Sequence, residues 1–142
     1  MNGFLVDTNV PSELIRARPD PNVKNWIYTQ DEQSLYLSAV SIGELRRGIV
    51  ILPPSKRRTD LEQWLENELI PRFKNRVLPV TQNIANLWGT LDGQRKLKGM
   101  PLAMADGMIA ATAIEHNLIL VTRNVNDFAH LRVVLLNPWN IP

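Results

Sequence analysis

Three acidic residues, Asp7, Glu44 and Asp106, occupy positions from which their carboxylates could act together. Asp7 directly follows a short apolar run that is typical of a buried parallel strand, and the other two fall near the start of predicted helices. In open α/β folds such strand-to-helix junctions lie along one edge of the sheet. We therefore expect the carboxylates to converge there, where they could bind a divalent cation and hydrolyse a phosphodiester bond.

The electrostatics of such a cluster favour a bound cation. Two like charges about 4 Å apart repel by roughly 1 kcal/mol in water and by about 4 kcal/mol at an effective dielectric constant of 20. Without compensation, at least one carboxylate would stay protonated. A Mg²⁺ ion compensates this charge and lowers the pKa of a water molecule that it binds.

The residue types available to such a site argue against other metals. The chain has no cysteine, and His116 and His130 are not spaced as a metal-binding pair, so both histidines are expected to be structural or to lie on the surface. A site with only oxygen ligands disfavours zinc.

Helix capping offers a separate explanation for each acid. Asp7 or Asn9 could cap the helix that follows the first strand. Ser41 and Glu44 have the spacing of a capping box, in which the glutamate bonds back to the backbone. Asp106 could simply place a negative charge at a helix N-terminus. These explanations do not account for all three acids falling on one edge of the sheet.

Alternating strands and helices predict an α/β fold with a mainly parallel sheet. The predicted strands cover residues 4–6, 35–38, 76–80, 118–121 and 133–136. The predicted helices cover residues 10–16, a short segment around 23–27, a segment from 41 to about 53, and residues 56–70, 81–98 and 103–116. Proline 71 is expected to stop or kink the fourth of these helices.

The composition indicates one globular domain over residues 1–142. An apolar content of 44% with 21% charged residues is that of a soluble protein. No apolar run approaches the roughly 18 residues that a membrane span needs. No signal peptide is visible, so we expect a cytoplasmic protein.

Lysine and arginine residues form several local groups although the net charge is only +2. These groups are Arg46-Arg47, Lys56-Arg57-Arg58, Arg72-Lys74-Arg76 and Arg95-Lys96-Lys98. Any one such group is most often a solvated helix face. Around an acidic metal pocket, however, basic residues would suit a nucleic-acid backbone as substrate.

Several motifs occur in the order found in one known family. They are Leu5-Val6-Asp7-Thr8-Asn9, Leu37-Ser38-Ala39-Val40-Ser41-Ile42-Gly43-Glu44-Leu45-Arg46, Ala105-Asp106-Gly107-Met108-Ile109-Ala110-Ala111-Thr112-Ala113, Leu120-Val121-Thr122-Arg123-Asn124 and Asn137-Pro138-Trp139. Together they cover nearly the whole chain. In this order the chain resembles the PIN-domain ribonucleases, in particular the VapC-type toxins of toxin–antitoxin pairs and their FitB-like branch.

The resemblance implies a five-stranded sheet of order 3-2-1-4-5 with helices on both faces. It implies an endoribonuclease that cleaves RNA through a water activated by Mg²⁺, for which Mn²⁺ can substitute. It also implies a homodimer, and a small DNA-binding antitoxin whose tail blocks the active-site groove.

The resemblance also implies roles for individual residues. Asp7 and Asp106 resemble the main metal ligands. Glu44 resembles a third acid that orients a water molecule or reaches the metal. The groups expected to hold the carboxylates in place are Thr8, Asn9 and Thr122.

The fourth acidic position of the family is occupied by Asn124. An amide oxygen can bind a metal ion but adds no negative charge, so weaker metal binding is expected. Asp127 lies three residues further on, where a helical turn could bring it back toward the site. Alternatively, Asp127 only caps that turn.

Two other functions are compatible with parts of the sequence. Phosphotransferases of the haloacid-dehalogenase type also begin with an apolar strand that ends in aspartate, but they need a second acid where this chain has Asn9. A non-catalytic PIN domain that acts as a binding partner is left open by Asn124.

Overall fold

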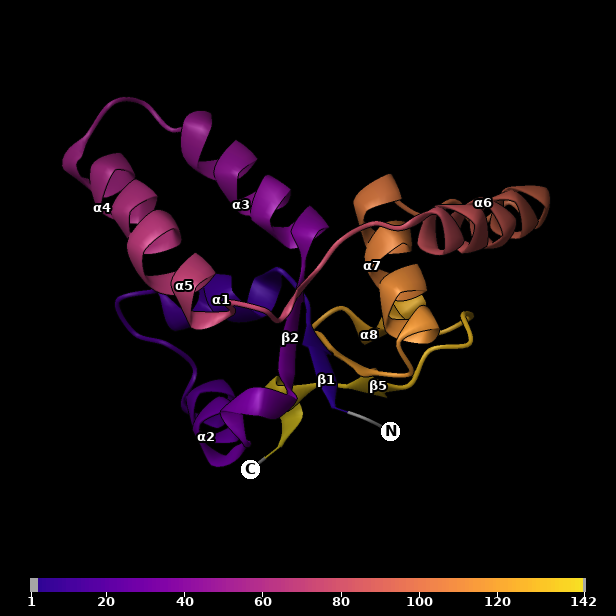
Figure 1. Cartoon of the computed structure of the whole chain (residues 1–142), viewed down its shortest axis with the longest axis horizontal. Helices are drawn as coiled ribbons and strands as arrows, with labels where there is room; N and C mark the ends of the chain where they lie inside the picture. The colour runs from indigo at the N-terminus through magenta and orange to yellow at the C-terminus, as the bar shows by residue number, and fades with distance from the viewer. Residues whose placement is uncertain (1–2, 142) are drawn as a thin grey trace.

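A five-stranded parallel sheet forms the centre of the computed structural model, which describes residues 3–141 (Figure 1). The strands are β1 (Phe4–Val6), β2 (Leu35–Ser38), β3 (Val77–Leu78), β4 (Ile119–Val121) and β5 (Leu135–Leu136). Their order is β3-β2-β1-β4-β5, and every neighbouring pair is parallel. The predicted topology is thus confirmed, although the two edge strands are shorter than the sequence pattern indicated.

Helices connect the strands and cover both faces of the sheet (Figure 1). They are α1 (Asn9–Leu14), α2 (Pro21–Thr29), α3 (Ala39–Val50), α4 (Lys56–Trp64), α5 (Ile70–Arg72), α6 (Gln82–Leu97), α7 (Met104–Glu115) and α8 (Val125–Phe128). Short 3₁₀ segments cover Glu32–Ser34 (η1) and Pro138–Asn140 (η3), and a π-helical segment, η2, covers Leu65–Leu69.

The two faces of the sheet belong to two separate hydrophobic clusters. Leu5 packs with Ile109 of α7, whereas its neighbour Val6 packs with Val10 of α1 and Trp26 of α2. Successive residues of a strand point to opposite faces, so the continuous apolar run of β1 fits a strand that is buried on both sides. This placement makes β1 the central strand and leaves its carboxyl end as the natural position for a site.

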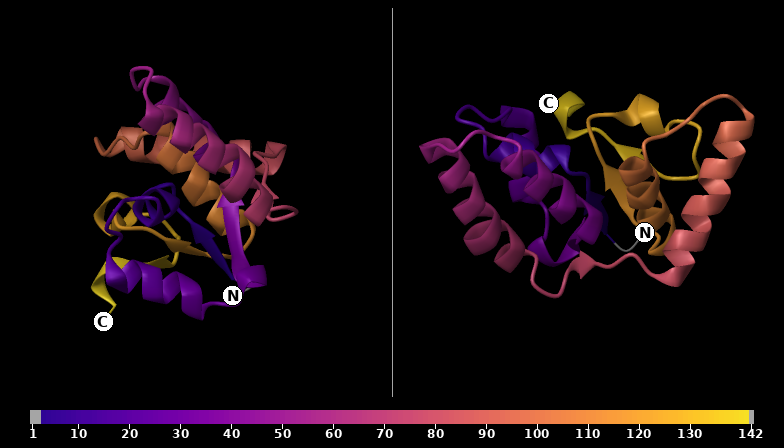
Figure 2. Two further views of the ribbon diagram at one scale, coloured as in Figure 1. Left: turned by 90° about the vertical axis from the view of Figure 1, so that its left-hand side faces the viewer. Right: turned by 90° about the horizontal axis from the view of Figure 1, so that it is seen from above.

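Two pairs of helices rise from the carboxyl edge of the sheet. Seen from above, α3 and α4 form one arm and α6 and α7 form the other, and the arms diverge from the sheet (Figure 2). The amino-terminal parts of α3 and α7 carry Glu44 and Asp106. The two arms therefore bring these acids to the edge at which β1 ends.

Pro71 does not stop the helix that begins at Lys56, which was one of the two predicted effects of this proline. Helical turns continue from α4 through η2 and α5 to Arg72. A proline ring normally clashes with the carbonyl four residues earlier, here that of Asn67. The wider π turn immediately before α5 moves this part of the backbone and accommodates the ring.

Arg76 is a buried arginine that ties three elements together near β3. Its guanidinium donates hydrogen bonds to the carbonyl oxygens of Glu32 and Leu35, both at 2.6 Å, and to that of Arg72. The side chain is only 7% exposed and also lies over the ring of Phe73. Arg76 is therefore a structural residue rather than part of a nucleic-acid surface.

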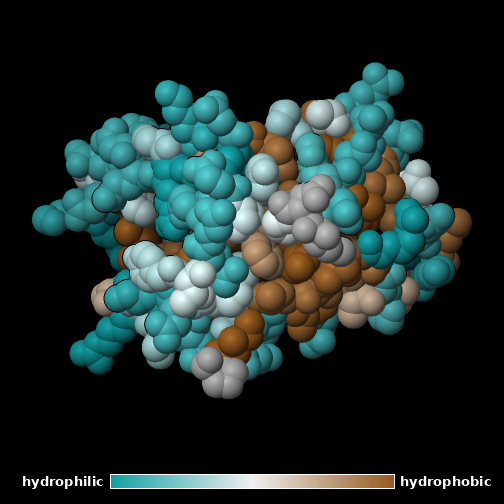
Figure 3. All heavy atoms as spheres, turned by 60° about the horizontal axis from the view of Figure 1, so that its bottom comes forward, coloured by the Kyte–Doolittle hydropathy of each residue, from teal (hydrophilic) through white to brown (hydrophobic). Residues whose placement is uncertain are grey.

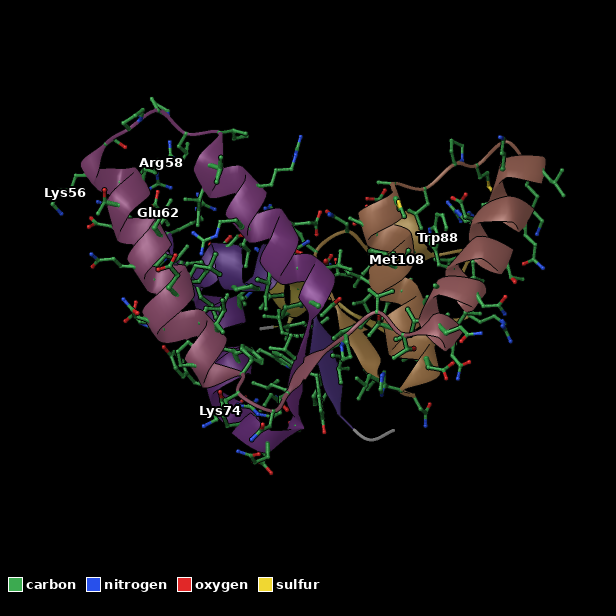
Figure 4. All side chains as sticks on the ribbon, turned by 45° about the horizontal axis from the view of Figure 1, so that its top comes forward. Lys56, Arg58, Glu62, Lys74, Trp88 and Met108 are labelled. Atoms are coloured by element: carbon green, nitrogen blue, oxygen red, sulfur yellow. The ribbon has the colours of Figure 1, made fainter. Side chains whose placement is uncertain are left out.

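Helices α6 and α7 pack closely at Gly107. Trp88 of α6 lies between the two helices, close to Met108 of α7 in the view of Figure 4. A Cβ atom placed on Gly107 would lie 2.7 Å from Cδ1 and 2.9 Å from Nε1 of Trp88. The glycine within this helix is thus explained by packing, as its helix-weakening character suggested.

Gly107→Ala is expected to lower the free energy of unfolding by about 1–2 kcal/mol, because the clash with Trp88 outweighs the better helix propensity of alanine. Gly93→Ala in α6 is the matched control, since its Cβ would meet no atom within 4 Å. That control should leave stability unchanged or raise it by up to about 1 kcal/mol. Urea denaturation measures both effects. Equal stability of Gly107→Ala and the wild type would contradict the close packing.

No helix within residues 3–141 is both long and apolar enough to cross a membrane. Viewed from below, apolar side chains form a continuous area at the centre and right, while hydrophilic side chains cover most of the left part of that face (Figure 3).

Candidate active site

Asp7 stands at the carboxyl end of β1 and is held by its own backbone and by its neighbours. Its N–H donates to the carbonyl oxygen of Val121 in β4 at 2.8 Å. Its carboxylate Oδ1 accepts the N–H of Thr8 at 2.8 Å, and Oδ2 accepts the hydroxyl of Thr122 at 2.8 Å. The Asn9 amide lies 3.5 Å from the same Oδ2. The carboxylate is therefore fixed in orientation at the edge of the sheet.

Glu44 reaches the same edge from α3 through Thr8. The hydroxyl of Thr8 lies 2.6 Å from Oε1 of Glu44 and 2.9 Å from Oγ of Ser41. That hydroxyl has one proton, which the carboxylate of Glu44 accepts, so the fully buried Ser41 donates to Thr8.

The capping box considered as an alternative for Ser41 and Glu44 does not form. Helix α3 begins two residues earlier, and Ser38 caps it by accepting the N–H of Val40 at 3.0 Å. The side chain of Glu44 is bound by a residue 36 positions away instead.

Asp106 lies in the first turn of α7 with its carboxylate half-buried. Burial, together with the negative charges of Asp7, Glu44 and Asp127, raises its pKa to about 6. Burial also raises the pKa of Asp7, against the hydrogen bonds from Thr122 and Thr8, and the charges of Glu44 and Asp127 add to the increase. These mutual effects show that the acids predicted to converge do share one region.

Asn124 and Asp127, which follow β4, differ in their relation to the acids. Asn124 occupies the N-cap position of α8, and its side chain makes no capping hydrogen bond. Its N–H donates to the hydroxyl of Thr122 at 3.0 Å. Asp127 is not the cap, and its charge acts on both Asp7 and Asp106. The structure thus brings the charge of Asp127, although exposed, toward the acids.

The donor set suits a divalent cation that keeps part of its water shell. Within residues 3–141, no three histidine, cysteine, aspartate or glutamate side chains are grouped so that they could hold a metal ion. At most two carboxylates could therefore bind one ion in this arrangement. Mg²⁺ is commonly bound in this way, by one or two carboxylates and several water molecules. Two further observations favour a ligand: the buried Oδ1 of Asn9 has no hydrogen-bond partner, and no hydrogen bond to the Asp106 carboxylate is present in the part of the chain described.

Comparison with known proteins agrees with this arrangement of fold and acids. The model of the PIN domain family matches residues 4–134. The chain belongs to the PIN domain family, and not to the phosphotransferases considered as an alternative.

Two named relatives span almost the same length as this chain. VapC ribonuclease Y4jK of Sinorhizobium fredii is 41% identical, over 96% of this chain and 97% of its own. Toxin FitB of Neisseria gonorrhoeae is 37% identical, over 96% of this chain and 99% of its own. The crystal structure of FitAcB from N. gonorrhoeae superimposes with a TM-score of 0.90 and 36% identity, covering 97% of this chain and 99% of that one.

Proposed function

We propose that this protein is a Mg²⁺-dependent endoribonuclease and the toxin of a type II toxin–antitoxin system. The observation that carries the proposal is the shared region of Asp7, Glu44 and Asp106, in which burial and, to a smaller extent, mutual repulsion raise the pKa values of both aspartates. The relatives named as a VapC ribonuclease and a toxin support it. In this proposal residues 1–142 form a single PIN domain that acts in the cytoplasm.

Asp7 and Asp106 would hold the metal ion, which when bound supplies positive charge to the phosphate and acidifies a water molecule. Thr8 and Thr122 keep the Asp7 carboxylate in one orientation through hydrogen bonds of 2.8 Å. Glu44, fixed at 2.6 Å by the Thr8 hydroxyl, keeps its second oxygen free to orient the attacking water. Mn²⁺ would substitute for Mg²⁺, because both prefer carboxylate and water oxygens.

A groove beside Glu44 would accept the tail of the antitoxin. It has a volume of about 310 Å³ and is lined by Thr8, Glu44, Arg57 and apolar side chains that include Leu61 and Trp64. An inhibitor with apolar anchors and one basic residue would complement this lining. Solved relatives include a FitAB complex bound to DNA, which supports a DNA-binding antitoxin, and we propose a homodimer as the toxin's own state.

The direct test is cleavage of RNA by the purified protein. Cleavage is expected with Mg²⁺ or Mn²⁺ and should stop when EDTA is added. Expression alone should be toxic, and a short neighbouring reading frame should suppress the toxicity. Full activity in EDTA would contradict metal-dependent hydrolysis, and harmless expression of an active nuclease would contradict the toxin role.

Asn124 favours a second candidate function, that of a non-catalytic binding partner, because it replaces an acid that the family often has. Binding of the metal ion and of the antitoxin without cleavage of RNA would support this alternative.

The Asn124 substitution leads to a prediction about metal affinity. Asn124→Asp is expected to tighten Mn²⁺ binding by about tenfold, or about 1.4 kcal/mol, because it restores a negative charge at the edge of the site. Asp127→Ala should cost less affinity than Asn124→Asp gains, because its carboxylate is exposed. Calorimetric titration of Mn²⁺ compares the two variants with the wild type. Unchanged affinity in Asn124→Asp together with abolished binding in Asp127→Ala would assign the fourth acid to Asp127.

A further inference from the structure

Arg123 lies beside the acidic region but forms an ion pair with none of its members. It directly follows Thr122, whose hydroxyl is bonded to Asp7. The side chain of Arg123 is exposed, and no hydrogen bond or ion pair to it exists within residues 3–141. Arginine next to carboxylates commonly forms strong paired hydrogen bonds with them. Its separation from the acids therefore needs a structural cause.

The indole ring of Trp139 supplies that cause. The guanidinium carbon of Arg123 lies 5.5 Å from the centre of this ring, which is within the range of a cation–π interaction. Stacking on an aromatic face leaves the N–H groups at the edges of the guanidinium free to bind another group. The acids consequently remain available to a cation, and the arginine remains available to an anion.

Trp139 is itself fixed by contacts with several other elements. Its N–H donates to the side chain of Asn137 at 3.0 Å, and its carbonyl oxygen accepts the side-chain amide of Asn22 in α2 at 3.1 Å. Its ring packs against the hydrophobic cluster that includes Val6 and Val10. The ring is thus a rigid support, and it limits the positions that the guanidinium of Arg123 can take.

Several of the basic residues that sequence grouping associated with a substrate are already paired with acids. Arg46 pairs with Glu66 at 2.7 Å, and Arg58 pairs with Glu62 at 2.9 Å on α4. Figure 4 shows that Lys56, Arg58 and Glu62 all belong to this arm of the molecule. Arg123 differs from them because its charge is uncompensated and because it lies at the carboxyl edge of the sheet.

We propose that Arg123, supported by Trp139, binds a backbone phosphate of the RNA next to the phosphate that is cleaved. The inference rests on the proposed ribonuclease function and names a contact for its substrate. Strands β4 and β5 end at the same edge as β1, and Arg123 directly follows Thr122, which bonds to Asp7, so Arg123 stands at the margin of the acidic region. An RNA backbone entering that region is repelled by the carboxylates, and a fixed guanidinium at its margin offsets this repulsion.

The test measures binding of a short fluorescein-labelled single-stranded RNA by fluorescence anisotropy over a series of salt concentrations. All proteins carry Asp106→Asn and are kept in EDTA so that the RNA stays intact. Arg123→Gln should bind more weakly, and its plot of log affinity against log salt concentration should be shallower by about 0.7, the value for one lost phosphate contact to a single strand. Arg132→Gln is the matched control. Arg132 is exposed and lies before the amino end of β5, whereas Arg123 follows the carboxyl end of β4.

Two further variants separate the charge of the arginine from its support. Arg123→Lys keeps the charge and should keep the salt slope, but it should lose part of the affinity because an ammonium group does not stack as guanidinium does. Trp139→Phe keeps an aromatic ring and should retain more affinity than Trp139→Leu. Thermal unfolding of both Trp139 variants shows whether they remain folded at the temperature of the assay.

The outcomes distinguish this contact from the nuclease function as a whole. In the chain with an intact Asp106, Arg123→Gln should raise the KM for RNA cleavage with little change in kcat, as expected for lost ground-state binding. If the wild type cleaves RNA and Arg123→Gln behaves as Arg132→Gln does, the contact is wrong and the nuclease stands. If the salt slope falls as expected but no cleavage occurs, the contact stands and the nuclease is wrong. Absence of RNA binding by every protein overturns both.

Discussion

Asp106→Asn should abolish RNA cleavage and, without metal, make the protein more stable at neutral pH. The loss of cleavage should exceed about 100-fold, because even partners of metal ligands contribute 10–100-fold. The gain in stability follows from the pKa of Asp106, which rises from an ordinary 3.8 to about 6 in the folded chain. A raised pKa means that folding disfavours the charged form. The stability that the folded protein loses through ionised Asp106 is absent below the unfolded pKa, grows between that pKa and about pH 6, and is constant at higher pH.

Urea denaturation in EDTA tests the stability effect, and a cleavage assay with Mn²⁺ tests the activity. The variant should exceed the wild type in stability at pH 8 and match it below about pH 4, where both side chains are neutral. Glu115→Gln is the control, since it also removes one negative charge from α7 but at the far end of the helix. Asp7→Asn should remove activity as well. Full cleavage by either aspartate variant would exclude Asp7 and Asp106 as the metal ligands.

Arg76→Met should cause the largest loss of stability among the changes considered. Methionine replaces the apolar part of the side chain but leaves the carbonyl oxygens of Glu32, Leu35 and Arg72 without their charged donor. Removing the donor of such a buried network costs about 3–5 kcal/mol. We expect the free energy of unfolding in urea to fall by that amount.

Two comparisons show whether this loss comes from the hydrogen bonds. Arg18→Met, at an exposed position, should change stability by no more than about 0.5 kcal/mol. Arg76→Lys should recover part of the loss, because it restores a charged donor but not the planar arrangement of guanidinium N–H groups. A stability of Arg76→Met equal to that of the wild type would show that other groups satisfy the three carbonyl oxygens.

Local sequence patterns predicted the elements whose bounds are set by residues close by in the sequence. The helix of residues 82–97 begins after Thr81, as expected, because the Thr81 hydroxyl accepts the N–H of Ile84. Strand β2 matches its predicted bounds, because an apolar run ends there at Ser38. The place of Asp7 at the carboxyl edge also followed from a general property of parallel sheets, whereas Asp106 lies on α7, which follows α6 and not a strand.

Sequence patterns left alternatives open where a distant residue decides between two local possibilities. The spacing of Ser41 and Glu44 fits a capping box as well as a pair that binds Thr8, and only the position of β1 beside α3 selects the second. The contact of Arg123 with Trp139 likewise joins two strands' ends and has no sequence signal beyond the residue types. Metal and substrate roles of the site residues stay predictions until the variants are measured.

The strand order determines when during synthesis the site can form. Central strand β1 pairs on one side with β2 and on the other with β4. Asp7 is translated 115 residues before Thr122, yet its N–H and its carboxylate depend on Val121 and Thr122. Because translation proceeds from the N-terminus, a ribosome-bound chain that has not yet reached Thr122 has an unpaired edge at β1 and an unsupported Asp7. A chain released before that point would therefore lack a formed site.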